Sequence, residues 1–176
     1  ASGDGTAKVW DIESGQCTMV LSNNEKWLWS ANYCQEGKRV VTGSIEGKIK
    51  IWDAPLGACI LSIEGYPSSV ECVSYSPTGK SFVFGSSKTV QIWDSQINKN
   101  LLTLRGHADL IETVAYSPDE ERITTGARDN TIKVWDVKSG RCLLTFSGHD
   151  DVIKSVIFSP NGNTILTCSL DRTARV

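Results

Sequence analysis

A Trp-Asp pair recurs four times in this chain of 176 residues, and its spacing constrains the fold more than any other feature. The Trp residues are separated by 42, 41 and 42 positions. Each pair closes a short segment in which apolar and polar residues alternate, as they do in a half-buried β-strand. The chain is therefore built from similar structural units that stack on one another. The pairs are Trp10-Asp11, Trp52-Asp53, Trp93-Asp94 and Trp135-Asp136.

Each repeat contains four predicted strands, which are clearest between residues 106 and 147. A mostly apolar inner strand follows His107 and ends at Ser117-Pro118, where Pro fixes φ near the value that a tight turn needs. Two strands with period-two alternation come next, and a turn then leads to an outer strand. The four predicted strands occupy residues 111–116, 122–125, 131–135 and 142–146.

Four strands in each unit of 41 or 42 residues are typical of β-propeller blades. We therefore predict an all-β protein, a β-propeller of four-stranded antiparallel blades. About four blades are present, and the family that the chain resembles, identified below from its repeated motifs, typically closes its rings with seven, which needs roughly 290 residues at this spacing. We accordingly expect the sequence to be a segment of a longer protein. The expected division is a partial blade 1–22, blades 23–63, 64–105 and 106–147, and a partial blade 148–176.

Charge and hydropathy argue against a nucleic-acid-binding protein and against a membrane-spanning protein. The formal net charge is −2 and acids and bases are interspersed, so the broad basic face that usually marks a nucleic-acid-binding protein is not expected. No apolar run approaches the roughly 18 residues that a membrane-spanning helix needs. We expect neither a membrane nor a nucleic acid as partner.

The six cysteines do not predict a disulfide framework or a metal site. Cys17, Cys59 and Cys142 occupy the same position in different repeats, so they lie too far apart for the Cα separation of about 7 Å that a disulfide tolerates. The others fall in or beside predicted strands, where reduced cysteine behaves as a small buried apolar residue. We expect free structural cysteines, no cofactor, and a reducing intracellular compartment, cytoplasm or nucleus. These other cysteines are Cys34, Cys72 and Cys168.

The repeated Trp-Asp pairs, with a Gly-His opening two of the repeats, make the chain resemble the WD-repeat β-propellers over its whole length. The resemblance implies a buried hydrogen-bond network in each blade. It joins a His before the inner strand, a Ser or Thr on the second strand, an Asp in the following turn and the Trp of the third strand. The matching residues here are His107, Thr125, Asp129 and Trp135 in one blade and His149, Thr167 and Asp171 in the last.

Two consecutive blades depart from this family pattern. In blade 23–63, Asn24 and Glu46 replace the His and the Asp, while Thr42 and Trp52 are retained. One interpretation is that such blades are held by apolar packing instead of the network. The other is that they carry a specialised binding face.

Blade 64–105 departs further from the pattern. Tyr66 stands at the His position, Phe84 replaces the hydroxyl residue, and the turn at 86–88 is one residue short and lacks the Asp. Only Trp93 remains of the four. The two aromatic replacements are suited to apolar packing, and the same two interpretations apply.

The Thr, His and Asp of the network imitate the nucleophile, base and orienting acid of a hydrolase. The trio recurs in two blades, however, whereas a catalytic site is ordinarily single, so a structural role is favoured. The His-x-Asp pairs, His107 with Asp109 and His149 with Asp151, supply two ligands each where a metal site usually has three or four. We expect no enzyme and no metal.

Partner binding is predicted at loops before the inner strands, which in the family lie near the central opening of one face. Trp27 starts one inner strand where other repeats have smaller residues, and Arg128 is the one charged residue at its position. Large aromatic residues and Arg are enriched among interface hot spots. Alternatively, Trp27 and Trp29 fill space left by Asn24 and Ala31, and Arg128 is an exposed solubilising residue. The candidate residues are Trp27, Arg128, Asp109, Leu110 and Asp151.

Three functions remain open from the sequence. The first is a non-catalytic scaffold that binds peptides or proteins through its loops and central opening. The second is a regulatory sensor or substrate-receptor domain of a larger signalling ATPase or ubiquitin-ligase component. The third is a propeller enzyme, which would need an isolated, non-repeating cluster of titratable residues that this sequence does not show.

Overall fold

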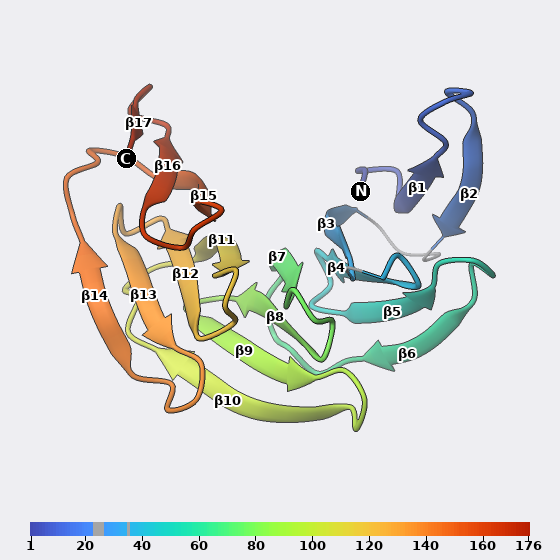
Figure 1. Cartoon of the computed structure of the whole chain (residues 1–176), viewed down its shortest axis with the longest axis horizontal. Coiled ribbons are helices and arrows are strands. Elements are labelled where there is room, and N and C mark those ends of the chain that lie inside the picture. The colour runs from blue at the N-terminus through green and yellow to red at the C-terminus, as the bar shows by residue number, and fades with distance from the viewer. Residues whose placement is uncertain (23–26, 35) are drawn as a thin grey trace.

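The computed structural model describes residues 1–22, 27–34 and 36–176, which form 17 β-strands and no helix. The strands make five antiparallel sheets that follow one another around an open arc (Figure 1). In each complete sheet the first strand lies inside the arc and the fourth lies outside. The predicted all-β class and the four-stranded antiparallel unit are confirmed. Within the described residues, no helix is available that could cross a membrane.

The three complete sheets have nearly identical strand lengths. The first comprises β3 (Leu28–Tyr33), β4 (Arg39–Ser44), β5 (Ile49–Asp53) and β6 (Cys59–Ile63). The second comprises β7 (Val70–Tyr75), β8 (Ser81–Ser86), β9 (Thr89–Asp94) and β10 (Lys99–Arg105). The third comprises β11 (Ile111–Tyr116), β12 (Arg122–Ala127), β13 (Ile132–Asp136) and β14 (Cys142–Phe146).

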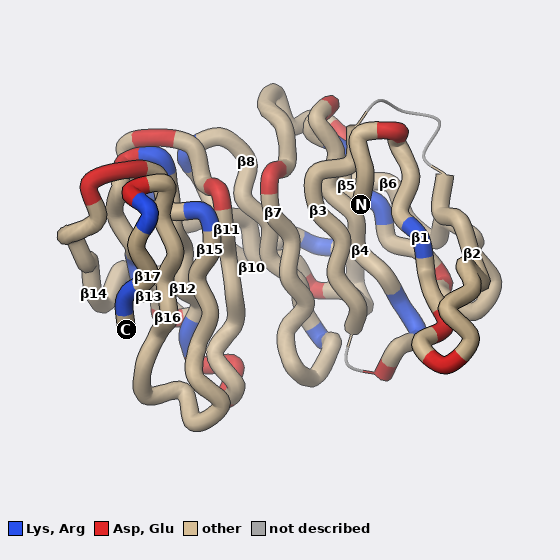
Figure 2. The backbone as a smooth tube through the Cα atoms, turned by 90° about the horizontal axis from the view of Figure 1, so that it is seen from above, with Lys and Arg blue, Asp and Glu red and all other residues tan. Residues whose placement is uncertain are grey.

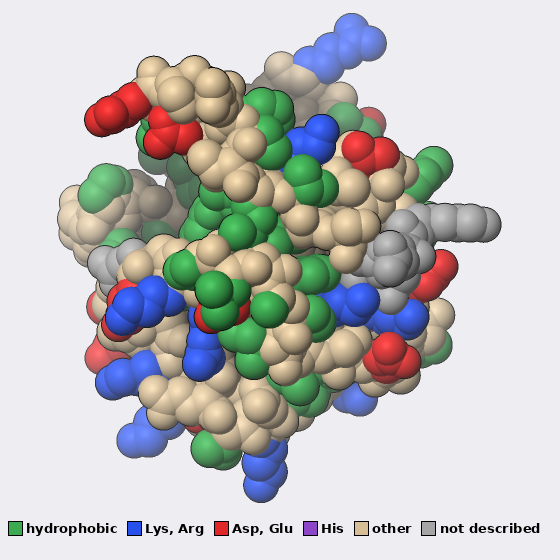
Figure 3. Space-filling view, turned by 90° about the vertical axis from the view of Figure 1, so that its right-hand side faces the viewer, with side chains coloured by type: hydrophobic (Ala, Val, Ile, Leu, Met, Phe, Trp, Pro, Cys, Tyr) green, Lys and Arg blue, Asp and Glu red, His purple; other side chains and the backbone are tan. Residues whose placement is uncertain are grey.

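A smaller sheet lies at each end of the arc, and the two ends are not in contact (Figure 1). At the N-terminal end β1 (Thr6–Trp10) pairs with β2 (Cys17–Ser22). At the C-terminal end β15 (Ile153–Phe158) and β16 (Ile165–Ser169) pair with the short β17 (Ala174–Arg175). Hydrophobic side chains reach the surface in the middle of the N-terminal end (Figure 3).

Neighbouring sheets touch through a repeated glycine on the second strand of each complete sheet. A Cβ added at Gly126 would lie 2.4 Å from Ile153 Cγ2 of the following sheet. A Cβ is not tolerated at such a distance, so the first residues of β7, β11 and β15 pack directly on the backbone of the preceding sheet. The same contact joins Gly43 to Val70 and Gly85 to Ile111.

The inner strands have one edge that is unpaired within their own sheet, and side chains of the preceding inner strand satisfy part of it. Val73 N donates to Ser30 Oγ at 3.1 Å, and Tyr75 N donates to Asn32 Oδ1 at 3.0 Å. Val156 N reaches Thr113 Oγ1 at 3.4 Å in the same way. Buried backbone donors need such acceptors, so these polar side chains hold successive sheets in register.

The loops divide between two faces of the arc, seen edge-on in Figure 2. We call the face that carries the loops before the inner strands, and the turns between second and third strands, the upper face. The lower face carries the turns that follow the inner and the third strands. These lower turns include the predicted Ser-Pro turns, in which Ser117 N donates to Arg122 O at 2.9 Å.

The cysteines are all free in the described chain, but their burial differs from the prediction. Cys34 and Cys72 are buried as expected, whereas Cys168 is exposed. It lies on β16, on the side where no further sheet packs in this structure, so being in a strand is not enough to bury it. The three outer-strand cysteines are exposed as well: Cys17, Cys59 and Cys142.

Candidate functional site

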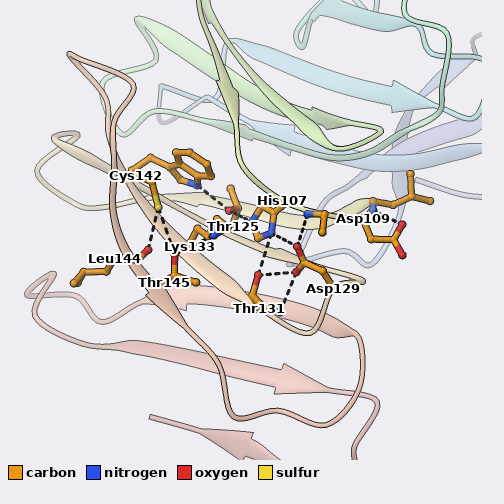
Figure 4. A network of polar contacts seen from close by, with 12 residues as sticks. His107, Asp109, Thr125, Asp129, Thr131, Lys133, Cys142, Leu144 and Thr145 are labelled. Atoms are coloured by element: carbon orange, nitrogen blue, oxygen red, sulfur yellow. Dashed lines mark hydrogen bonds and ion pairs between the residues drawn. The ribbon is translucent and has the colours of Figure 1, made fainter.

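The third complete sheet contains a continuous chain of buried hydrogen bonds (Figure 4). Trp135 Nε1 donates to Thr125 Oγ1 at 2.9 Å, and Thr125 Oγ1 lies 2.7 Å from His107 Nε2. His107 Nδ1 lies 2.9 Å from Asp129 Oδ2. Asp129 Oδ2 also accepts from the backbone N–H of Ala108 at 2.7 Å. The four residues named from the family resemblance are thus in contact with one another.

The direction of these bonds assigns a neutral His107. Because Thr125 Oγ1 accepts the indole proton, its own proton is free for His107 Nε2, and Nδ1–H then donates to Asp129. Burial lowers the pKa of His107, although Asp129 opposes this shift. Partial burial raises the pKa of Asp129, but hydrogen bonds from Thr131, Ala108 and His107 outweigh it, so that pKa is lowered.

The last sheet repeats the arrangement. His149 Nδ1 lies 2.6 Å from Asp171 Oδ2, and His149 Nε2 lies 2.9 Å from Thr167 Oγ1. The hydrogen bonds that Asp171 accepts from Thr173 and His149 lower its pKa against the opposing effect of burial. The two copies share the His, Thr and Asp contacts, which hold the upper turns to the strands.

The first complete sheet retains half of the network. Trp52 Nε1 donates to Thr42 Oγ1 at 3.0 Å, and both residues are buried. Glu46, at the Asp position, is exposed and lies 3.9 Å from Lys48 Nζ. Asn24, at the His position, lies outside the described residues.

The second complete sheet replaces the network with aromatic packing. The ring of Tyr66 meets that of Phe84 edge to face at 4.9 Å, and Phe82 stacks on Trp93 at 6.4 Å. The indole N–H of Trp93 is buried without an acceptor among the described residues. A different polar centre is present on the third strand, where Gln91 Oε1 accepts from Asn100 and Thr103 at 2.8 and 2.7 Å.

Every inner strand has an irregular register at its second residue, and this irregularity shapes the upper face. The pairing skips one residue between Ile111 and Thr113 of β11, and the same happens in β3, β7 and β15. A β-bulge of this kind redirects a side chain. We call the four skipped residues the bulge row: Trp29, Glu71, Glu112 and Lys154.

Glu112 of the bulge row joins two sheets through a buried ion pair. Its side chain is only 5% exposed, and it accepts hydrogen bonds from Arg128 of its own sheet and Lys154 of the next. Burial raises the pKa of Glu112, but the two cations outweigh that effect and lower it. Arg128, predicted as a partner-binding or solubilising residue, thus has an internal carboxylate partner. The sequence did not indicate this partner, because the bulge decides where Glu112 points.

Trp27 and Trp29 form an exposed aromatic pair at the start of β3. Their rings meet edge to face at 5.7 Å, and they remain 50% and 46% exposed. Trp27 has a φ of 37°, which is unfavourable for a bulky residue. Its ring lies against Gly3, where an added Cβ would be 3.7 Å from Trp27 Cδ1. The two indoles therefore occupy the surface rather than the core.

The remaining candidates occupy equivalent places on the upper face. Asp109 and Asp151 are exposed, and each caps the backbone N–H of its successor at 2.7 Å. Leu110 is partly buried, and its carbonyl accepts from Arg128 N at 2.9 Å. The structure thus brings Leu110 and Arg128 together, whereas Trp27 belongs to a sheet two places away.

Comparison with known protein families agrees with this architecture. The family model described as WD domain, G-beta repeat, matches the chain four times, and the chain belongs to the WD-repeat family. Each match begins near the outer strand of one sheet and ends at or near the third strand of the next sheet. One sequence repeat therefore spans two consecutive sheets. No curated protein matches the sequence significantly. The matched residues are 15–53, 57–94, 98–136 and 140–176.

Acidification is expected to weaken the network of the third complete sheet. Because the pKa of His107 in the folded protein lies below its ordinary value of 6.5, the unfolded chain binds this proton more readily. Its contribution to stability is complete above about pH 7 and is lost as the pH falls below about 6.5, while the lowered pKa of Asp129 causes a further loss below about pH 4.

Urea unfolding at pH 7.5 and pH 5.5 tests this expectation. The wild-type protein should lose up to about 1 kcal/mol more stability between these pH values than a His107→Gln variant does. Equal losses in the two proteins would show that His107 does not contribute.

Proposed function

We propose that the chain is a non-catalytic protein-interaction scaffold that binds partner proteins or peptides through the loops of its upper face. WD-repeat domains are generally interaction scaffolds. The observation that carries the proposal for this chain is the Trp27–Trp29 pair, because two large aromatic rings are half-exposed side by side. Residues of this type supply much of the binding energy at protein interfaces.

The geometry of the polar networks supports a non-catalytic role. Thr125 has no exposed surface, and its hydroxyl already contacts both Trp135 and His107. A nucleophile in that position could not reach a substrate without unfolding of the sheet. Among the described residues there is also no group of three or more side chains placed to hold a metal ion.

The same proposal includes an intracellular location. Four cysteines are free and exposed in the described chain. Exposed thiols persist in reducing compartments, where disulfide formation is reversed. The cytoplasm and the nucleus both fit this chemistry.

Replacing Trp27 with Ala is expected to reduce partner capture at least about tenfold while lowering the melting temperature by less than about 2 °C. The tenfold figure follows because a half-exposed indole loses its contact with the partner and little contact with the core. Affinity capture followed by quantitative mass spectrometry, with thermal unfolding in parallel, measures both effects.

Trp10→Ala is the matched control for this experiment. Trp10 is 57% exposed, close to the value for Trp27, but it lies on β1 and not in an upper-face loop. Its replacement should leave capture unchanged. If Trp27→Ala melts several degrees lower and captures the same partners, Trp27 is part of the core and the proposed surface is wrong.

A further inference from the structure

Trp29 and Glu71 occupy the same bulge-row position in two adjacent sheets. Their strands, β3 and β7, lie side by side in Figure 2, where Glu71 is the acidic segment of β7. Val70, which precedes Glu71, packs on the backbone of Gly43. Gly43 in turn pairs with Ser30, the residue after Trp29. The two side chains therefore start from neighbouring points of the upper face.

Side chains of the bulge row can touch across the junction between two sheets. At the junction of the third complete sheet with the last sheet, Lys154 donates to Glu112, although the two residues belong to different sheets. Trp29 and Glu71 are related in the same way at the junction of the first two complete sheets. One long side chain of a ligand can therefore contact both of them.

Glu71 lacks the cations that neutralise Glu112, its counterpart in the third complete sheet. Glu112 receives Arg128 from the turn of its own sheet and Lys154 from the next bulge-row position. The bulge-row residue after Glu71 is Glu112 itself, a second acid. The upper turn beside Glu71 is one residue short, and its exposed cation, Lys88, makes no ion pair within the described residues. An incoming cation would supply what the chain does not place there.

The carboxylate of Glu71 also keeps free acceptor positions. Its one hydrogen bond within the described chain comes from Ser69 Oγ, which donates to Oε1 at 2.6 Å. A carboxylate has about four positions at which it can accept a hydrogen bond. Most of them therefore remain for a ligand.

The charges around Glu71 leave an excess of negative charge. The hydrogen bond and the charge of Glu112 raise the pKa of Arg128, and the charges of Glu71 and Asp109 add to that rise. One guanidinium thus faces three carboxylates. With Lys154 included, three carboxylates oppose two cations, so the group has a net charge of −1.

The first complete sheet places apolar side chains next to this negative charge. Trp27, Trp29 and Ile45 are all exposed on the upper face. Ile45 stands at the position of Arg128, and its N–H donates to Trp27 O at 3.1 Å. Exposed aromatic and aliphatic surface therefore adjoins a carboxylate that has no cation paired with it in the described chain.

We propose that the upper face binds an arginine side chain of a partner protein, with the guanidinium placed against Trp29 and Glu71. A guanidinium stacks on an aromatic face and donates two parallel hydrogen bonds to a carboxylate. Its alkyl stem covers apolar surface while the charged end stays at the polar edge. The inference rests on the proposed scaffold function and names the chemistry of the partner at that surface.

Arginine fits this surface better than lysine does. The ammonium of lysine is a compact and strongly hydrated charge that does not stack on a ring, whereas the planar guanidinium is weakly hydrated and offers a flat face and a two-pronged edge. Trp29 meets the first of these features and Glu71 meets the second.

Titration of the protein with the tripeptide acetyl-Gly-Arg-Gly-amide, followed by the indole N–H signals in NMR spectra, tests the proposal. We expect the signals of Trp27 and Trp29 to shift, while that of Trp10, which is similarly exposed but lies on β1, stays in place. A tripeptide with citrulline, which has the shape of arginine without its charge, should bind at least about tenfold more weakly. The lysine tripeptide should bind about threefold more weakly.

Glu71→Gln should raise the Kd of the arginine tripeptide about fivefold to tenfold. Its melting temperature should stay within about 2 °C of the wild type, because the amide oxygen can still accept from Ser69. Trp29→Ala should raise the Kd about threefold. Glu121→Gln is the matched control, since it removes the same charge from an exposed turn of the lower face, and it should bind like the wild type.

Equal binding of the arginine and citrulline tripeptides, or equal effects of Glu71→Gln and Glu121→Gln, would overturn the proposal. Free arginine that binds as tightly as the tripeptide would overturn it in favour of a small guanidinium compound. If the tripeptide fails to bind while Trp27→Ala still loses partner capture, this inference is wrong and the scaffold proposal stands. If the tripeptide binds through Glu71 while capture does not depend on Trp27, the proposed capture surface is wrong and the arginine site remains.

Discussion

Replacing Asp129 with Ala is expected to lower the free energy of unfolding by about 3–5 kcal/mol. The carboxylate accepts hydrogen bonds from His107, from the backbone N–H of Ala108 and from both the backbone and the hydroxyl of Thr131. Its removal leaves these donors with no acceptor at a site where water has little access, since Asp129 is only 11% exposed. Urea unfolding at pH 7.5 measures the effect.

Asp109→Ala provides the matched control, because Asp109 is an exposed aspartate in the neighbouring loop of the same upper face, before β11. Among the described residues, its carboxylate accepts a hydrogen bond only from the neighbouring backbone N–H of Leu110. The expected change in stability is within about 0.5 kcal/mol. Similar losses in the two variants would mean that the network does not stabilise the sheet, and a loss of partner binding in Asp129→Ala without a loss of stability would argue against its structural role.

Replacing Gly126 with Val is expected to destabilise the protein by about 3 kcal/mol through overpacking. The added Cβ would lie 2.4 Å from Ile153 Cγ2 and 2.9 Å from Thr113 Cγ2. Ile153 begins the inner strand of the last sheet and cannot move away without separating the third and last sheets, while Thr113 is held by the pairing of β11 with β12. The melting temperature and the urea midpoint should both fall.

A double-mutant cycle with Ile153→Ala tests whether this contact causes the loss. In a protein that already carries Ile153→Ala, Gly126→Val should cost at least about 1 kcal/mol less than in the wild type, because the clashing side chain has been shortened. Additive losses would contradict direct overpacking. Gly3→Val, in a loop where an added Cβ meets Trp27 only at 3.7 Å, should have little effect.

The repeat period explains why so much of the fold was predictable. Period-two alternation before each Trp-Asp pair, and Ser-Pro at the turns, are local signals that recur, so several repeats support each strand. The predicted outer strand at 142–146 and the observed β14 (Cys142–Phe146) coincide. The second strand was predicted to end at Thr125 and continues to Ala127, because Gly126 weakens the alternation while its backbone still pairs with Ile132.

The residues of the polar network were named from the family resemblance, and the structure places them in contact. The interactions between sheets were not named, because they join residues about 42 positions apart. In the sequence, nothing distinguishes Glu112 from an exposed acidic residue on a strand. Its burial between Arg128 and Lys154 depends on a bulge and on the next sheet, neither of which has a local sequence signal.

By itself, the sequence determined the class of protein, the length of each structural unit and the positions of the strands, since these follow from local alternation, turn chemistry and repetition. Only the tertiary structure decided which residues at the same repeat position are buried or hydrogen-bonded in one sheet and exposed or without a partner in another. Trp27 and Cys168 are exposed, and the Tyr75 hydroxyl makes no hydrogen bond within the part of the chain that the structure describes. The physical reason is that burial and hydrogen bonding depend on what the adjacent sheet places opposite each residue.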